Sequence, residues 1–183
     1  MIDDYQGEEF IKNVCSMGAT KAAIVPVVEI VLDRSFRGVC EQNSCGMYGK
    51  CWQCPPDAGD IDILMDRVRS YLFALVYQLV GDVEDSYDFE GMQRVKQMHV
   101  QLALRIRKEF EKKQIRSALH LGSGGCGVCH ECAKRHKQAC RFPELAMSSL
   151  EAYGIYVSHL AQIAGMNYIN GENTVTYFGA VLF

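Results

Sequence analysis

The chain of 183 residues lacks any apolar run as long as the roughly 18 residues that cross a membrane. Its first residues, from Met1 to Phe10, are acidic and polar, without the basic start and apolar core of a secretory signal. We therefore expect a soluble, cytoplasmic protein. The length favours a single domain, residues 1–183, which can bury a core without covalent or metal cross-links.

The familiar catalytic signatures are also missing. There is no nucleophile elbow, no Walker glycine loop and no HExxH pair, no internal repeat and no low-complexity segment. Gly122, Gly124 and Gly127 match the G-x-G-x-x-G spacing of dinucleotide sites, but Cys126 lies inside the match and Cys129 just beyond it. Wrapping of a metal cluster explains these glycines better. The sequence therefore names no substrate, and whether the protein is an enzyme stays open.

Cysteine is what the chain has in abundance, and eight of its nine cysteines form two tight groups. The first group is C-x4-C-x5-C-x2-C, at Cys40, Cys45, Cys51 and Cys54, and the second is C-x2-C-x2-C-x7-C, at Cys126, Cys129, Cys132 and Cys140. Four thiolates close a tetrahedral zinc site or hold one cubane iron–sulfur cluster. In a reducing compartment such groups are metal ligands more often than disulfides, so all eight cysteines are candidate cofactor and metal ligands.

The second group favours an iron–sulfur cluster over zinc. Bacterial ferredoxins grip a cubane with a similar C-x2-C-x2-C run, whereas zinc sites usually take cysteines in pairs. The first group has a single C-x2-C pair and suits a second cluster or zinc, with a Cys51/Cys54 redox dithiol as the least favoured alternative. A cysteine of one group could also serve the metal of the other. Trp52 could shield the first metal from solvent.

Other residues near the groups have weaker claims as ligands. His130 lies within the second group, but four cysteines already suffice there, and the other histidines show no metal-ligand spacing. Glu144 and Glu151 are most simply explained as charges at helix starts. Cys15 has no partner group and is expected to be a buried, inert thiol in a helix over 8–17.

Hydrophobic patterning predicts a mixed α/β sandwich with a central sheet of about four strands and two cysteine-rich loops at strand ends. The long helix is expected to turn Val95, Met98, Leu102, Ile106 and Phe110 toward the core. A second helix is expected over 60–69 and should start near Asp60 or Asp62. A third is expected over 150–153, with Ser148 or Ser149 as its cap, and a fourth over 158–164. The expected long helix spans 89–113, and the expected strands span 23–32, 71–80, 117–121 and 174–183.

Charge is unevenly distributed along the chain. Between Arg94 and Arg141 there are twelve Lys or Arg and three acidic residues, so this segment carries +9 while the whole chain carries -3. The cations could compensate an anionic metal centre, or dock an acidic protein partner or an anionic ligand. Nucleic acid is the least favoured partner because the chain is acidic overall and shows no nucleic-acid module.

Three blocks of sequence resemble an uncharacterised family of predicted metal-binding proteins, the domain of unknown function numbered twenty-two eighty-four. They are 45–56 with Cys51-Trp52-Gln53-Cys54, 126–155 with the second cysteine group, and 176–182 near the end. The resemblance implies metal binding, with iron–sulfur chemistry in anaerobic bacteria and archaea, but no reaction. In the family pattern a non-cysteine residue often precedes the tryptophan, whereas this chain has Cys51. If Cys51 is not a ligand, the first site needs a different fourth one.

Three hypotheses follow for function. The first is an iron–sulfur protein with up to two [4Fe–4S] clusters that passes electrons to a redox partner enzyme in anaerobic metabolism. The second is a structural zinc-binding interaction module. The third is an iron–sulfur enzyme in which one cluster has an open iron, with the first group as the better candidate. The sequence does not indicate an oligomeric state.

Overall fold

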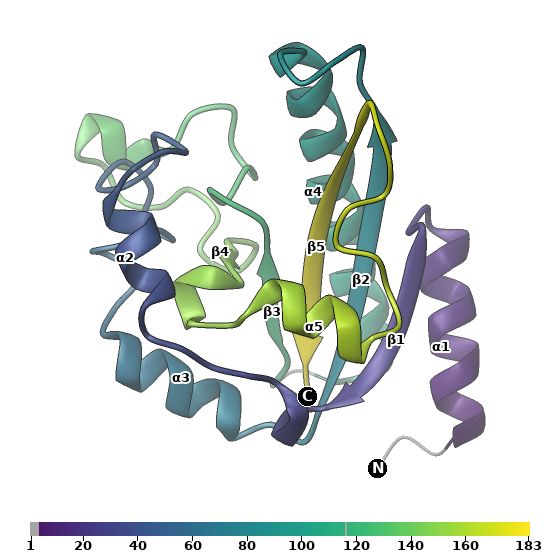
Figure 1. Cartoon of the computed structure of the whole chain (residues 1–183). Helices are drawn as coiled ribbons and strands as arrows, with labels where there is room; N and C mark the ends of the chain where they lie inside the picture. The colour runs from purple at the N-terminus through teal and green to yellow at the C-terminus, as the bar shows by residue number, and fades with distance from the viewer. Residues whose placement is uncertain (1–3, 116) are drawn as a thin grey trace.

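The computed structural model describes residues 4–115 and 117–183. Within this range one sheet has five strands in the order β1-β2-β5-β3-β4, one more than the four expected (Figure 1). Neighbouring strands are antiparallel, except that β3 and β4 are parallel. The mixed α/β class is confirmed. The strands are β1 (Lys21–Pro26), β2 (Phe73–Asp82), β3 (Leu119–Gly122), β4 (Ser148–Ser149) and β5 (Thr174–Leu182).

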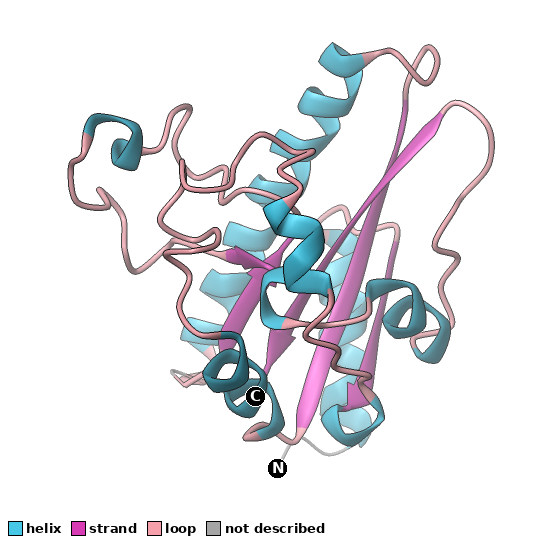
Figure 2. Cartoon of the chain, turned by 60° about the vertical axis from the view of Figure 1, so that its left-hand side comes forward, coloured by secondary structure: helices cyan, strands magenta, loops and turns pink. Residues whose placement is uncertain are grey.

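Helices cover both faces of the sheet, as two views of the chain show (Figures 1 and 2). α1 and α4 pack on one face in one apolar cluster, and α3, α5 and η3 contribute to a second cluster on the other face. No helix in the described part of the chain is both long and apolar enough to traverse a bilayer. The α-helices are α1 (Asp4–Ser16), α2 (Phe36–Glu41), α3 (Ile61–Arg69), α4 (Phe89–Lys112) and α5 (Val157–Ile163), and the 3-10 helices are η1 (Val27–Glu29), η2 (Ala133–His136) and η3 (Glu151–Tyr153).

Strand β2 lies inside the sheet and is buried on both faces. Ala74 and Val76 point into the cluster with α3 and α5, while Leu75, Tyr77 and Leu79 point into the cluster with α1 and α4. Successive side chains of a strand alternate between faces, so a strand covered on both sides needs apolar residues throughout. This explains the nearly continuous apolar run in its sequence and confirms the predicted buried strand.

Helix α4 forms as predicted, but the prediction that Met98 is buried is wrong. Met98 is 53% exposed, and His99 takes the buried place beside it. His99 follows Val95 by four residues, one helical turn, whereas Met98 lies on the flank of that row. A polar residue on the buried face was not anticipated because apolar spacing alone selected Met98.

The expected strand over 23–32 is interrupted at Pro26. β1 ends there, and the chain turns into η1 before Leu32 forms an isolated bridge with Ile155. Proline has no N–H to donate to a ladder, and β1 is an edge strand, so the ladder loses little at this position. The predicted strand therefore ends at Pro26 and does not reach residue 32.

The expected helix after Ser148 and Ser149 is also different in the structure. The two serines form β4, which pairs with Leu121 and Gly122 of β3, and only the 3-10 helix η3 follows. The Ser149 hydroxyl accepts a hydrogen bond from the Ala152 amide at 3.1 Å, so it still caps the turn. The other expected elements are present within a few residues of their predicted bounds, and the Asp60 side chain caps α3.

Gly81 of β2 allows α4 to lie close against the sheet. A Cβ at this position would be 2.4 Å from Cγ2 of Val95, a contact that side chains cannot make without moving. We expect Gly81→Ala to lower the free energy of unfolding by about 1–3 kcal/mol, since overpacking displaces side chains and backbone. Gly7→Ala in α1 is the control, because its Cβ would lie 3.6 Å from Ile24. Equal urea midpoints for both variants would contradict this packing.

His120 of β3 is 8% exposed and packs edge-on against Phe110, with ring centroids 5.5 Å apart. Burial, followed by the nearby charge of Arg107, lowers the pKa of His120 to about 3. Between the unfolded value of roughly 6.5 and this pKa, only the unfolded chain binds the proton. The free energy of unfolding should therefore decrease as the pH is lowered from about 6.5 toward 3. The decrease due to this residue should reach about 1.4 kcal/mol per pH unit.

Urea unfolding at pH 6 and pH 5 measures this contribution as a difference between proteins. His120→Gln should show a smaller fall in unfolding free energy than the wild type. His136→Gln, which changes an exposed histidine paired with Glu131, is measured beside it for comparison. Equal pH dependence in all three proteins would show that His120 is not buried in its neutral form.

Candidate metal centre

The two cysteine loops lie side by side at one end of the sheet, beyond β4 and α2 (Figures 1 and 2). The second loop leaves the end of β3, as predicted, and Cys126 follows the strand closely. The first loop does not leave a strand. Cys40 lies within α2, and the remaining cysteines of the group follow in a series of turns. The expectation that both loops begin at strand ends is therefore correct only for the second.

An ion pair between the loops holds them together. Lys134 in η2 pairs with Asp57, and their side chains are only 16% and 21% exposed. The Lys134 ammonium also lies over the ring of Trp52, 4.6 Å from its centroid. The Trp52 indole donates to the carbonyl of Gln138 at 2.9 Å. Each of these contacts joins one cysteine loop to the other.

A second set of contacts closes the loops on the side of the sheet. The Ser148 hydroxyl donates to Oε1 of Gln53 at 3.1 Å, which ties the first loop to β4. Met47 lies directly against Gly125, where a Cβ would be only 2.8 Å from the methionine methyl. Gly124 and Gly127 have positive φ angles of 61° and 71°, which confirms the expected role of this glycine stretch in turning the chain.

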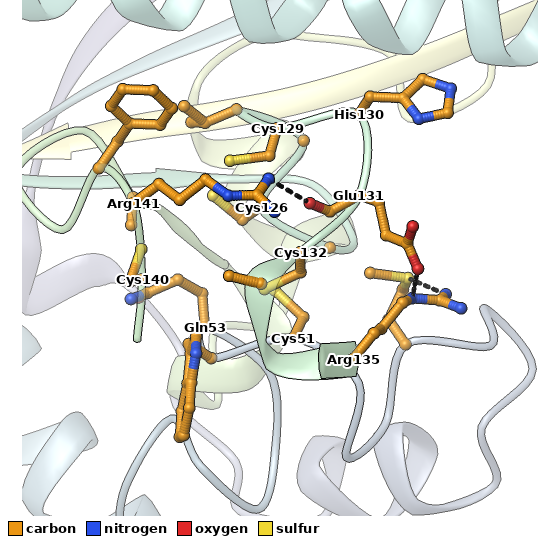
Figure 3. Close-up of a pocket in the computed structure, with 18 of the residues that line it drawn as sticks. Cys51, Gln53, Cys126, Cys129, His130, Glu131, Cys132, Arg135, Cys140 and Arg141 are labelled. Carbon is orange, nitrogen blue, oxygen red and sulfur yellow. Dashed lines mark hydrogen bonds and ion pairs between the residues drawn. The ribbon is translucent and has the colours of Figure 1, made fainter. Parts of the chain in front are cut away.

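The loops enclose a cavity of about 360 Å³ that is lined by cysteines of both groups (Figure 3). Cys40 and Cys54 are outside its lining. Among the described residues, no three His, Cys, Asp or Glu side chains converge closely enough to hold a single metal ion. The thiols are instead spread around a shared space. The lining cysteines are Cys45, Cys51, Cys126, Cys129, Cys132 and Cys140.

Cys51 is the cysteine at which the two groups meet. It is 1% exposed. Its sulfur accepts hydrogen bonds from the Cys54 thiol, from the amides of Cys126 and Gln53, and from the Cys132 thiol. The Cys54 thiol and these other donors lower the pKa of Cys51 against the opposing effect of burial. The hydrogen bond with Cys51, followed by burial, raises the pKa of Cys54, so Cys51 ionises first in this pair.

Other cysteines have pKa values dominated by burial. Burial raises the pKa of Cys126, although amides of Met147 and Val128 donate to its sulfur, the former at 3.5 Å. Burial also raises the pKa of Cys40, and the nearby carboxylate of Glu151 adds to the effect. Neutral thiols are favoured here until a cation offsets the lost hydration. Metal binding would supply that cation and release the protons.

Charged side chains surround the mouth of the cavity. Arg141 donates to the carbonyl of Glu131 at 3.3 Å, and Arg135 pairs with the Glu131 carboxylate at 3.8 Å (Figure 3). Lys96 of α4 also contributes to the lining. His130 lies at the edge, and its ring points away from the cysteines (Figure 3). His130 therefore lines the cavity with its ring turned away from the thiols.

Sequence reasoning missed the role of several residues around the thiols. Glu151 was explained as a charge at a helix start, but it is half-buried beside Cys40, and burial raises its pKa. Asp57 and Lys134, which join the loops, carried no signal because they lie far apart in the sequence and match no motif. Trp52 does line the cavity, where it was expected to shield a metal.

Six thiols around one enclosed space, on loops braced against each other, define a cysteine-rich metal-binding protein. The chain belongs to the family described as predicted metal-binding protein, DUF2284, whose model matches residues 23–183. No curated protein and no solved structure matches the chain. The matched residues include both cysteine groups and the whole sheet except the first two residues of β1, and the family description does not specify the metal.

The Lys134–Asp57 pair should matter more for stability than a surface ion pair. Asp57→Ala leaves the largely buried Lys134 ammonium without its carboxylate, which we expect to lower the free energy of unfolding by about 1–3 kcal/mol. Asp66→Ala breaks an exposed pair with Arg69 and should change it by less than about 0.5 kcal/mol. Urea unfolding at equal metal content measures both. Similar small effects would mean that the pair does not brace the loops.

Proposed function

We propose that this protein holds iron–sulfur clusters, up to two of the [4Fe–4S] type, and passes electrons to a redox partner enzyme in anaerobic metabolism. The observation that carries the proposal is the cavity of about 360 Å³ lined by six thiols. A single zinc ion requires four ligands to converge on one point at roughly 2.3 Å. A cubane takes its thiolates at separate corners, so thiols that line a shared cavity suit it better than a single ion.

The surrounding chain suits a thiolate-held cluster. Amides of Met147 and Val128 donate to Cys126, and amides of Gln53 and Cys126 donate to Cys51. Hydrogen bonds to sulfur favour the thiolate, and they are one of the factors that set the reduction potential of a cluster. Such a cluster, when bound, supplies reversible one-electron transfer. The protein's part is to hold the thiolates, limit water access and present one edge to a partner.

Basic side chains at the cavity mouth favour an acidic redox partner. Arg135, Lys137 and Arg141 all belong to the second cysteine loop, and the first and last of them line the cavity. A carboxylate-rich surface would be attracted to this loop, and electron transfer would occur across the cavity mouth. Electrostatic attraction of this kind raises association rates and weakens with salt. The acidic remainder of the chain would repel such a partner elsewhere.

Metal and sulfide analysis of anaerobically purified protein tests the proposal. We expect about eight iron and eight acid-labile sulfide per chain for two cubane clusters, or about four of each for one. The protein should be brown, should lose visible absorbance with dithionite, and should regain it when an electron acceptor is added. Cys15→Ala, which changes the cysteine outside both groups, is the matched control and should retain full content.

Stoichiometric zinc without sulfide would contradict the proposal and favour a structural zinc-binding interaction module. Clusters that dithionite cannot reduce, or that do not return electrons to an acceptor, would contradict electron transfer while leaving the cofactor assignment intact.

A further inference from the structure

Cys51 is grouped by sequence with Cys40, Cys45 and Cys54, but it lines the cavity together with all four cysteines of the second group, whereas Cys40 and Cys54 do not. Its sulfur contacts the Cys54 thiol of its own group, and it also contacts the amide of Cys126 and the thiol of Cys132. Figure 3 shows Cys51 beside Cys132. The placement of this thiol therefore brings it to the second group as well as to Cys54.

The position of Cys51 is fixed by its neighbours. The next residue, Trp52, is held by its hydrogen bond to Gln138 and by the ammonium of Lys134, and Gln53 is held by Ser148. Cys51 itself is 1% exposed. The contacts of Trp52 and Gln53 hold this stretch of the first loop against the second loop and β4.

Cys140 is the alternative fourth thiolate of the second group, and its placement is weaker. It is separated from Cys132 by η2 and by Lys137, which has a left-handed φ of 55°. It is half-buried, whereas Cys51 is fully buried. Ferredoxins offer a precedent, since the fourth cysteine of a C-x2-C-x2-C run can serve another cluster.

We propose that Cys51 supplies the fourth thiolate of the centre held by Cys126, Cys129 and Cys132, and that Cys140 is a spare thiol at the edge of the cavity. This inference rests on the proposed function, because it requires a metal centre in the cavity. Its consequence is that the first group keeps three thiolates, Cys40, Cys45 and Cys54. A centre built there has one coordination position that no cysteine of its group fills, and this position is available to an exogenous ligand.

Single and double alanine variants test the assignment, with iron, sulfide and the electron paramagnetic resonance spectrum of the reduced protein as readouts. Cys45→Ala and Cys129→Ala serve as references for loss of the first and second centres. Cys51→Ala should lose about half of the iron and sulfide, and its remaining spectrum should match that of Cys129→Ala. Cys140→Ala and the control Cys15→Ala should keep wild-type content. Circular dichroism checks that each variant is folded.

The double variants distinguish the two assignments. Cys51→Ala combined with Cys129→Ala should lose no more iron than Cys129→Ala alone, because both residues serve one centre. Cys51→Ala combined with Cys45→Ala should lose both centres. The reverse pattern would overturn the inference and return Cys51 to the first group. In a wild type with only one cluster, Cys51→Ala should abolish it and Cys140→Ala should retain it.

Two further outcomes show whether the inference about Cys51 or the proposed function has failed. Loss of the second centre in Cys140→Ala overturns the inference even if Cys51→Ala fails to fold, whereas full retention in Cys140→Ala supports it. A wild-type protein without iron or sulfide instead overturns the proposed function, before any variant is compared.

Discussion

The ion pair between Lys134 and Asp57 is the contact on which the site depends. Two charges that lose most of their hydration are stable only when they remain paired, so the pair fixes the distance between the cysteine loops. Trp52 adds a second constraint, because its ring lies under the same ammonium and its indole binds the opposite loop. Without these contacts nothing in this pair of side chains would hold the two cysteine loops next to each other. With them, six thiols line one cavity.

The sheet explains why the loops meet at this position. β3 delivers the second loop, and β4 returns the chain to the sheet beside it, so both ends of that loop are anchored in neighbouring strands. Ser148 of β4 then binds Gln53 in the first loop. The first loop has no strand of its own at its start and depends on these partners. A rigid support on one side and a braced loop on the other is an arrangement that can hold a polyatomic cofactor in one orientation.

Local patterns accounted for much of the fold but not for the arrangement of the thiols. The long helix, the buried strand β2 and the cap at Asp60 were predictable because periodicity and capping are properties of neighbouring residues. The two-residue strand β4 was not, because its pairing with β3 is a tertiary contact without a pattern of its own. The same reason applies to Cys51. Spacing placed it in the first group, but its sulfur also contacts the Cys126 amide and the Cys132 thiol of the second loop.

Anomalous diffraction at the iron edge, from crystals grown without oxygen, tests the central claim that both loops build one shared centre. The account predicts an iron peak inside the cavity, within bonding distance of sulfur from Cys51, Cys126, Cys129 and Cys132. Iron bonded to Cys140 in place of Cys51, or iron found only outside the cavity, would contradict it.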